Sequence, residues 1–385
     1  MIPYGRQDIT KEDIEAVKDV LSSDFLTQGP KVPEFEKEVA NYCDSKFAVA
    51  VNSATSALHI ACLALGVSKG DLVWTAANTF VASANCALYC GAAIDFVDID
   101  KNTFNISLID LENKLVIAKQ KNNLPKVLIP VHMCGQSCDM RKIKELSEIY
   151  GFKIIEDASH AIGGHYLDSK IGSCKYSDIT VFSFHPVKII TSGEGGMAIT
   201  NDEKLSIKMN LYRSHGITRD STMMENEAEG QWYYEQLVLG FNYRMTDIHA
   251  ALGLSQFKSI DSNIKIRNSL AEEYNQLLKD LPLELPSSNP NIISSFHLYV
   301  IRLKKESMIS HKYFFESLRA KKILVNLHYI PVYFHPFYQK LGFKRGYCPN
   351  AEEFYSTAVS IPMFTRLTNN DQLFVTNSIK ESLGY

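Results

Sequence analysis

Two short apolar runs decide the fold: Lys153-Ile154-Ile155-Glu156-Asp157 and Ile179-Thr180-Val181-Phe182-Ser183-Phe184-His185-Pro186-Val187-Lys188. Each begins with the length and apolar content of a buried strand and ends in polar residues. Similar runs alternate with segments of helical period from about residue 48 to residue 200, a pattern typical of βα units around a mostly parallel sheet. The carboxyl ends of the strands in such a sheet converge on one crevice. We therefore expect Asp157 and Lys188 to face a shared ligand.

The fold class predicted from this pattern is α/β, with a mostly parallel central sheet and flanking helices. The predicted strands are Ala48–Val51, Leu72–Thr75, Ile94–Val97, Val127–Val131, Lys153–Glu156 and Ile179–Phe184. The predicted helices between them are Thr55–Leu65, Val81–Tyr89 and Met140–Tyr150.

Beyond Thr246 the pattern changes to longer helices and then to a smaller α+β domain. Helices are predicted at Asp247–Phe257, Asn263–Leu278, Lys312–Lys321 and Ala351–Ala358, with strands at His297–Leu303 and Ile323–Asn326 and a break at 282–290. We expect a large domain over 1–258 and a small C-terminal domain over 259–385. The polar segment 218–230 is expected to run over the surface, either as a mobile loop or as a lid. The following Trp232-Tyr233-Tyr234 is expected to pack it down, with the lining of a ligand site as the alternative.

Composition restricts the class of partner. The 385 residues are 45% hydrophobic and 22% charged with a net charge of −3, so no basic surface for nucleic acid is expected. The sequence has neither a signal-peptide pattern nor a membrane-spanning run, and we expect a cytoplasmic protein with a small soluble partner. The eight cysteines are scattered in apolar runs, and Cys134 and Cys138 lack a second ligand pair. We therefore expect neither a structural metal nor disulfides.

The residue pair at the strand ends matches the chemistry of pyridoxal phosphate (PLP). Lys188 stands between Val187 and Ile189, where desolvation favours the uncharged, nucleophilic amine needed to form an imine. An aspartate such as Asp157, aimed at a pyridine nitrogen, keeps that nitrogen protonated and makes the ring an electron sink. Taken singly, each residue is as typical of a solvated strand end or a turn.

A phosphate site is predicted at Val51–Leu58, where a strand, small hydroxyl residues and a helix start follow one another. An ordinary helix cap would have the same sequence. Gly193–Ala198 fits G-x-G-x-x-A and raises a nicotinamide oxidoreductase as an alternative. Because a strand-like run follows instead of a helix, that reading is weakened.

These segments resemble the DegT/DnrJ/EryC/StrS sugar aminotransferases, within the fold-type I PLP-dependent transferases. The motifs that carry the resemblance are Asn52–Leu58, Glu156–Ala161, Ser183–Lys188 with Gly193–Gly196, and Gly240–Met245. The resemblance implies that Lys188 forms the Schiff base with PLP and that Asp157 contacts the ring nitrogen. It further implies a ring-covering role for Phe80, and a position near the phosphate for Ala54, Thr55 and Ser183.

His160 and Asn242 receive further roles from the same resemblance. His160 stands where relatives often have glutamine, in a position that hydrogen-bonds the cofactor's phenolic oxygen, and a histidine there could titrate. Asn242 matches a residue that reaches the phosphate of the neighbouring subunit, which implies a homodimer with two shared sites. Ala76–Phe80 departs from the family pattern, because relatives often carry proline before the aromatic residue.

A narrower similarity, to the branch that makes UDP-4-amino-4,6-dideoxy-N-acetyl-β-L-altrosamine in pseudaminic acid biosynthesis, lies in Ile2–Gln7, Ser23–Gly29 and Asn326–Tyr333. It implies amino transfer from L-glutamate to C4 of a UDP-linked 4-keto-6-deoxy-N-acetylhexosamine, with 2-oxoglutarate as co-product and pyridoxamine phosphate (PMP) formed during the cycle. The implied substrate-binding residues are Tyr4, Asp24, Phe25, Leu26, Thr27, Arg244, Asn326, His328 and Tyr329.

Other functions remain open at this point. A C4 or C3 aminotransferase acting on another UDP-, GDP- or dTDP-keto-sugar would carry the same cofactor motifs. A PLP-dependent sugar dehydratase has histidine in place of the Schiff-base lysine, so Lys188 argues against it. A non-catalytic sugar-binding regulator is disfavoured because Lys188, Asp157 and Thr55 are all present.

Overall fold

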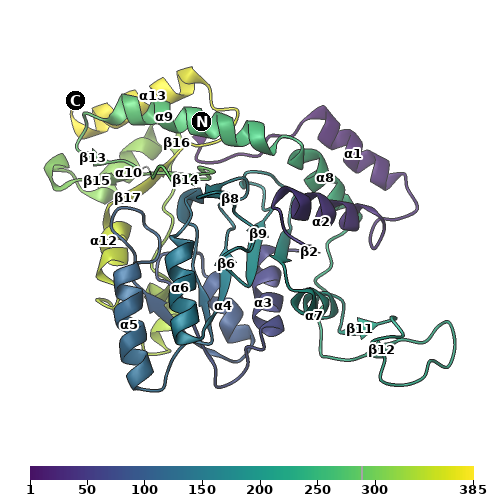
Figure 1. Cartoon of the computed structure of the whole chain (residues 1–385). Coiled ribbons are helices and arrows are strands. Elements are labelled where there is room, and N and C mark those ends of the chain that lie inside the picture. Colours follow the sequence, from purple (N-terminus) through teal and green to yellow (C-terminus); the bar gives the residue numbers. More distant parts are fainter. Residues whose placement is uncertain (288) are drawn as a thin grey trace.

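The structure is a computed structural model that describes residues 1–287 and 289–385. Residue 288, inside the predicted break at 282–290, lies outside the described residues. A seven-stranded sheet in the order β2-β10-β9-β6-β5-β3-β4 forms the centre of the molecule (Figure 1). Its strands are β2 Phe47–Val51, β3 Leu72–Ala76, β4 Ala93–Val97, β5 Val127–Ile129, β6 Lys153–Asp157, β9 Ile179–Ser183 and β10 Gly196–Thr200.

The predicted mostly parallel sheet is confirmed, and β10 is its antiparallel member. β10 pairs antiparallel with both β2 and β9, whereas the remaining neighbours run parallel. This strand follows the Gly193–Gly195 turn, so no helix follows the glycines. β5 ends at Ile129, before the predicted end at Val131. Pro130, which has no N–H to donate to a ladder, follows it directly, and φ is positive further on at Cys134 and Gly135. Val131 makes only an isolated bridge to Asp157.

Helices cover both sides of the central sheet (Figure 1). They bury one large apolar cluster against it, centred on residues such as Val73, Ile129 and Ile154. The sequence sets the bounds of α6, which Asp139 caps at its start and Gly151, at φ 81°, terminates. The helices against this sheet are α3 Ala54–Ala64, α4 Ala82–Tyr89, α5 Leu108–Gln120, α6 Met140–Tyr150 and α7 Glu203–Arg213.

A second apolar cluster lies between the sheet and two helices, α2 Lys31–Tyr42 and α8 Asp247–Phe257, and includes Ile260 and Ile264. Helix α1 Lys11–Leu21 packs on α8 from outside this cluster. Phe35 on α2 packs against Phe184 and Phe257, with ring centroids 5.0 and 6.3 Å away. Gly253 of α8 lies against the Phe35 ring, where a Cβ would come within 2.7 Å of it. The helices can therefore approach this closely only with glycine at that position.

The C-terminal region builds a third apolar cluster of its own around the sheet β13-β15-β17. Its α9 begins at Ile260, three residues before the predicted start, and the predicted division at residue 258 falls between α8 and α9. Two segments cross that division. β1 pairs with β16 in parallel, and α11 with α12 returns to the apolar cluster of the large sheet. The elements concerned are β1 Ile2–Pro3, α9 Ile260–Leu278, β13 Leu283–Glu284, β15 Tyr299–Leu303, α10 His311–Ala320, β16 Ile323–Leu324, α11 Pro336–Gln339, α12 Pro349–Thr357, β17 Ala358–Ile361 and α13 Asn369–Leu383.

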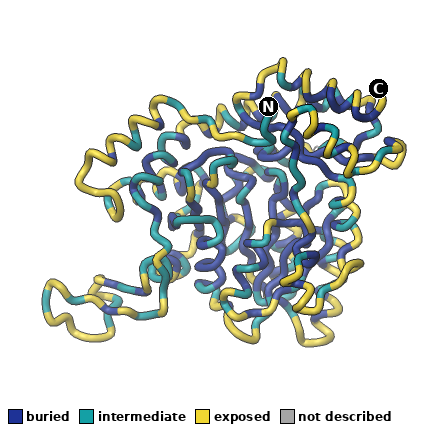
Figure 2. Tube along the Cα trace, turned by 180° about the vertical axis from the view of Figure 1, so that it is seen from behind, coloured by how far each residue is buried: buried dark blue, intermediate teal, exposed yellow. Residues whose placement is uncertain are grey.

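A small sheet and an arm complete the fold. The small sheet contains β14 Ile292–Ile293, β7 His165–Tyr166 and β8 Ser169–Lys170, and the arm is the hairpin of β11 Ile217–Thr218 and β12 Glu235–Gln236. The arm projects from the body beyond α7, and most of it is exposed (Figure 2). Within the described residues, no helix combines the length and the apolar character needed to cross a bilayer.

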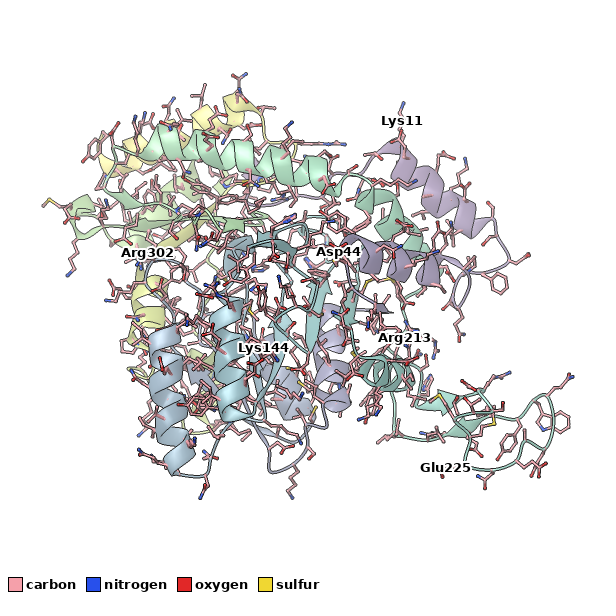
Figure 3. The ribbon with its side chains drawn as sticks, in the orientation of Figure 1. Lys11, Asp44, Lys144, Arg213, Glu225 and Arg302 are labelled. Carbon is pink, nitrogen blue, oxygen red and sulfur yellow. The ribbon has the colours of Figure 1, made fainter. Side chains whose placement is uncertain are left out.

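The prediction that Trp232 packs the segment 218–230 down is wrong, because Trp232 is 72% exposed. The tip of the arm is instead ordered from within. The Glu235 carboxylate accepts the backbone N–H groups of Glu225 and Asn226 at 2.6 and 2.9 Å. Arg213, near the base of the arm (Figure 3), donates to the carbonyl oxygen of Ala50 at 2.9 Å and pairs with Glu36.

Arg267 on α9 is a fully buried guanidinium that ties the C-terminal region together. It donates to the carbonyl oxygens of Phe296, His297 and Met363, and burial lowers its pKa to about 10. We expect Arg267→Met to lower the free energy of unfolding in urea by about 3 kcal/mol, because three buried acceptors lose a charged donor. The exposed Lys265→Met on the same helix should change it by less than about 0.5 kcal/mol. Equal losses in the two variants would contradict the role given to Arg267.

Candidate active site

A cavity of about 880 Å³ lies at the carboxyl ends of the central strands. Asp157 ends β6, Ser183 ends β9, and the N-terminus of α3 follows β2. The cavity therefore occupies the crevice that the strand pattern predicts. Of the predicted site residues, those that line it are Tyr4, Ala54, Thr55, Phe80, Asp157, His160, Ser183, Lys188, Asn326, His328 and Tyr329.

Lys188 reaches this cavity from the turn after β9. Its backbone N–H donates to the carbonyl oxygen of His185 at 2.9 Å, and Ile189 and Ile190 anchor the turn in the second apolar cluster. Burial lowers the pKa of Lys188 to about 8, and the charge of Asp157 opposes the shift. A lowered pKa is what the apolar neighbours Val187 and Ile189 predict from the sequence. Near neutral pH, an appreciable fraction of the amine is therefore uncharged and nucleophilic.

The carboxylate of Asp157 is held by two donors on the floor of the cavity. Oδ2 accepts from the hydroxyl of Ser83 at 2.6 Å, and Oδ1 accepts from the backbone N–H of Ser159 at 3.1 Å. The Ser83 hydroxyl lies 2.7 Å from that of Thr79, next to Phe80. Phe80 itself is 57% exposed and lies 6.0 Å from the Tyr329 ring, measured between centroids.

Three histidines surround the amine without adding charge. Burial is the largest cause that lowers the pKa of His160, His297 and His328, with the charge of Lys188 next, and the pKa of His328 falls to about 3. The expectation that His160 could titrate is therefore corrected: it is neutral at physiological pH. Its Nε2 lies 3.1 Å from the hydroxyl of Tyr329.

His297 also belongs to the site, although no sequence motif indicates it. Its ring lies 4.4 Å from that of His160 between centroids, and it lines the cavity. It was predicted only as the first residue of a strand, and no motif around it marked it as part of the site. Glu194 and His249 also line the cavity without having been predicted.

The N-terminus of α3 is built to receive an anion. Ser53 caps the helix and accepts from the N–H of Ser56 at 3.1 Å, which leaves the N–H groups of Ala54 and Thr55 in the first turn without intrahelical acceptors. β10 approaches this turn so closely that a Cβ on Gly196 would lie 2.4 Å from the nitrogen of Ala54. Helix N–H groups at one end of the cavity, with an amine and a carboxylate deeper inside it, are the groups that the phosphate, aldehyde and ring nitrogen of PLP require.

The other predicted site residues do not line this cavity. Asp24, Phe25, Leu26, Thr27 and Asn242 are exposed, and Arg244 is partly exposed. The two segments that carry them lie together, since Thr27 bridges to Thr246 and the N–H of Asp247 donates to the carbonyl oxygen of Leu26 at 3.0 Å. The fully buried Asp247 carboxylate holds the turn that follows, accepting from the N–H groups of Gly29, Lys31 and Val32 at 2.6, 2.8 and 3.1 Å.

Comparison of the sequence with known proteins identifies the family of this chain. The model of the DegT/DnrJ/EryC1/StrS aminotransferase family matches residues 7–380. The chain is 38% identical to a Campylobacter jejuni protein named UDP-4-amino-4,6-dideoxy-N-acetyl-beta-L-altrosamine transaminase, covering 98% of this chain and 96% of that protein.

Solved structures agree. Helicobacter pylori PseC, described as an aminotransferase involved in the biosynthesis of pseudoaminic acid, superposes with a TM-score of 0.90 at 32% identity, covering 100% of this chain and 99% of that chain. A putative sugar aminotransferase from Streptococcus pneumoniae in its PMP form gives 0.90 at 28% identity with the same coverage. The chain belongs to the DegT/DnrJ/EryC1/StrS aminotransferase family and is a PLP-dependent sugar aminotransferase.

Proposed function

We propose that the enzyme transfers the amino group of L-glutamate to C4 of a UDP-linked 4-keto-6-deoxy-N-acetylhexosamine, giving UDP-4-amino-4,6-dideoxy-N-acetyl-β-L-altrosamine. The likeness to the Campylobacter transaminase over nearly the full length of both chains carries this proposal. The cavity of about 880 Å³ supports it, because a cofactor and a sugar have to fit side by side. We also propose a cytoplasmic location, which suits the eight free thiols.

Each group of the cavity has a part in this reaction. PLP, when bound, supplies an electron sink for the carbon that bears the transferred nitrogen. Ala54 and Thr55 in the first turn of α3, with Ser183 at the end of β9, would hold the phosphate, and the Asp157 carboxylate would keep the ring nitrogen protonated. Lys188 would hold the cofactor at rest and, once free, would move a proton at the reacting carbon, for which an amine with a pKa of about 8 is well matched.

We assign His160 to the phenolic oxygen of the cofactor, and His328 with Tyr329 to the orientation of the substrate. Their low pKa values keep His160 and His328 uncharged beside Lys188, so the amine is not further acidified by neighbouring cations. The Tyr4 ring is tilted against that of His328, with the centroids 5.0 Å apart, and both residues line the cavity together with Asn326. We assign Tyr4, Asn326, His328 and Tyr329 to the sugar.

We further propose a homodimer that shares its two sites. Asp24–Thr27, Asn242 and Arg244 lie outside their own cavity on two joined segments. When a second copy presents them together, Asn242 would reach the phosphate of the cofactor, and Asp24–Thr27 with Arg244 would complete the nucleotide-sugar end of the cavity.

The lowered pKa of Lys188 predicts how covalent attachment of PLP depends on pH. Only the uncharged amine attacks the aldehyde, so in cofactor-free enzyme the rate of attachment should rise with pH and level off above about pH 8. Timed borohydride reduction followed by peptide mapping measures this rate. An ordinary lysine would give a rise that continues to about pH 10.4. A label elsewhere than at Lys188, or its persistence in Lys188→Arg, would refute the assignment.

Shared sites predict that two inactive variants restore each other. When Lys188→Ala and Asn242→Ala chains are co-expressed with separate tags, a mixed dimer contains one site with both residues intact. Random pairing should then recover up to about a quarter of wild-type activity. Mixing Lys188→Ala with Lys188→Arg is the control and should recover none. If the first mixture only averages its parents, Asn242 does not serve the neighbouring site.

A substrate panel tests the proposed reaction. The enzyme is incubated with glutamate and UDP-, GDP- and dTDP-linked keto-sugars, and the amino-sugar products are identified by mass spectrometry and NMR. We expect turnover of the UDP-linked 4-keto-6-deoxy-N-acetylhexosamine at C4, with kcat/KM at least about tenfold above that of the other nucleotides. Amination at C3, or preference for a GDP- or dTDP-sugar, would overturn the substrate assignment and leave the cofactor chemistry intact.

A further inference from the structure

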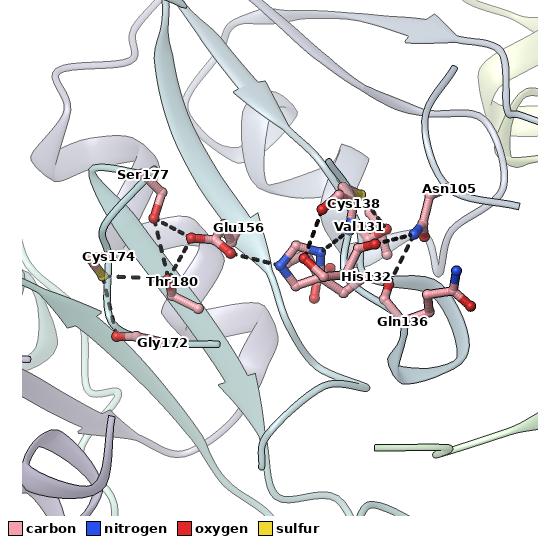
Figure 4. A network of polar contacts seen from close by, with 12 residues as sticks. Asn105, Val131, His132, Gln136, Cys138, Glu156, Gly172, Cys174, Ser177 and Thr180 are labelled. Atoms are coloured by element: carbon pink, nitrogen blue, oxygen red, sulfur yellow. Dashed lines mark hydrogen bonds and ion pairs between the residues drawn. The ribbon is translucent and has the colours of Figure 1, made fainter. Parts of the chain in front are cut away.

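Behind the cavity, on the opposite face of the sheet, a carboxylate is enclosed in a polar network (Figure 4). Glu156 precedes Asp157 on β6, and because side chains alternate along a strand, the two point to opposite faces. Glu156 Oε2 lies 2.7 Å from Nε2 of the fully buried His132. Its Oε1 accepts from the hydroxyls of Ser177 and Thr180. None of these groups lines the cavity, and the proposed reaction uses none of them directly.

The hydrogen bonds fix the proton on the His132 ring. The backbone N–H of Cys138 donates to Nδ1 at 3.1 Å, so Nδ1 is an acceptor and the ring is neutral with its hydrogen on Nε2. Nε2 therefore donates to Glu156. Burial disfavours the charged carboxylate, but His132, Ser177 and Thr180 together outweigh it and hold the pKa of Glu156 below its usual value. Against the effect of burial, the interactions with Cys138 and Glu156 raise the pKa of His132. A hydrogen on Nδ1 would nevertheless collide with the Cys138 N–H, so in this geometry a neutral ring clamps the carboxylate.

The same segment holds the backbone of Asp157. The N–H of His132 donates to the carbonyl oxygen of Asp157 at 3.0 Å, and the N–H of Asp157 donates to that of Pro130 at 2.9 Å. Since β5 ends at Ile129, residues 130–132 run beyond the regular sheet, and the His132 ring fastens them to its back face. A shift of this segment would carry Asp157 with it.

The turn after His132 links this clamp to the rest of the cavity floor. The Gly135 carbonyl accepts from the N–H of Ser295 at 3.1 Å, and the Ser295 hydroxyl donates to the carbonyl oxygen of His160 at 2.6 Å. Gly135 and Ser295 are tightly packed, because a Cβ on Gly135 would lie 2.3 Å from the Ser295 hydroxyl oxygen.

We propose that His132 and Glu156 are positioning residues for transamination. Their hydrogen bond locks residues 130–132 against β6 and so holds the Asp157 carboxylate at the ring nitrogen of the cofactor. The inference rests on the proposed role of Asp157. Displacement of a reacting or orienting group by about 1 Å can cost about a hundredfold in rate, so a clamp outside the cavity can still control the chemistry.

His132→Asn tests the clamp, because its side-chain oxygen can still accept from the Cys138 N–H but its amide is too short to reach Glu156. We expect the dissociation constant for PLP to rise about tenfold and kcat to fall between about tenfold and a hundredfold, with little change in KM for glutamate. Glu156→Gln keeps an acceptor for His132 and amide hydrogens for the hydroxyls, so it should stay within about threefold of wild type. If His132→Asn does not fold, Ser177→Ala removes one donor to the same carboxylate and should give a smaller loss of PLP affinity.

Asp98→Asn separates positioning from stability. Asp98 is a buried carboxylate outside the cavity lining, where it accepts the N–H groups of Asn350 and Ala351 at the start of α12. The Asp98→Asn variant should lower the Tm of cofactor-free protein about as much as His132→Asn does, while its PLP affinity should stay unchanged. Should His132→Asn, or its substitute Ser177→Ala, lose stability with no loss of PLP affinity, the proposal is overturned.

A double-mutant cycle with Asp157→Asn tests whether His132 acts through Asp157. If it does, His132→Asn in the Asp157→Asn background should add less than about twofold to the loss of PLP affinity. If the losses of PLP affinity in the two single variants add up in the double variant, His132 does not act through Asp157, and this proposal is overturned. The role of Asp157 in the proposed function then stands, provided that Asp157→Asn alone lowers affinity or rate. If Asp157→Asn alone changes neither affinity nor rate, the role of Asp157 fails, and this proposal fails with it.

Discussion

An amine has to be available in its uncharged form near neutral pH inside a cavity lined with ionisable groups, and the rest of the site depends on this constraint. Burial lowers the pKa of Lys188 to about 8, while the nearby carboxylate of Asp157 pulls in the opposite direction. The histidines beside the amine could have acted as competing cations. Because they are themselves desolvated, His160, His297 and His328 stay neutral. The interior thus keeps the histidines neutral and leaves a usable fraction of the Lys188 amine uncharged.

The fold brings these groups together because several parallel strands end at the same edge of the sheet. The antiparallel strand β10, between β2 and β9, begins at that edge. β10 runs opposite to its neighbours, and Gly196 lets it pass against the first turn of α3. The anion end of the cavity and the amine therefore share a rigid frame. Segments of the C-terminal region then cover the frame, because Asn326–Tyr329 line the cavity and Arg267 holds the chain around His297. The floor of the cavity is fixed from behind by His132 and Glu156.

Periodicity and strand-end chemistry were enough to predict the sheet, its ligand crevice and the nearness of Asp157 to Lys188. Those features depend on local patterns, such as the cap at Asp139 and the stop at Gly151 that define α6. His297 and the His132–Glu156 pair could not be found in this way, because their surroundings come from segments far apart in the chain. The family resemblance supplied most other site residues by matching position. The exposure of Trp232 was missed for a related reason, since a sequence does not state whether an aromatic residue has a surface to pack on.

The residues outside the cavity follow a physical logic of their own. A buried aspartate costs free energy unless it is well hydrogen-bonded, and Asp247 meets this need with three backbone donors at the start of α2. Its burial therefore ties the 24–31 segment to the 242–247 segment as one unit. That unit presents Asn242 and the exposed side chains of Phe25 and Leu26 outward, with no part of its own cavity beneath them. Exposed apolar residues joined so firmly to predicted ligand-binding residues suit a surface that is covered by another chain, which is why a shared site explains both features at once.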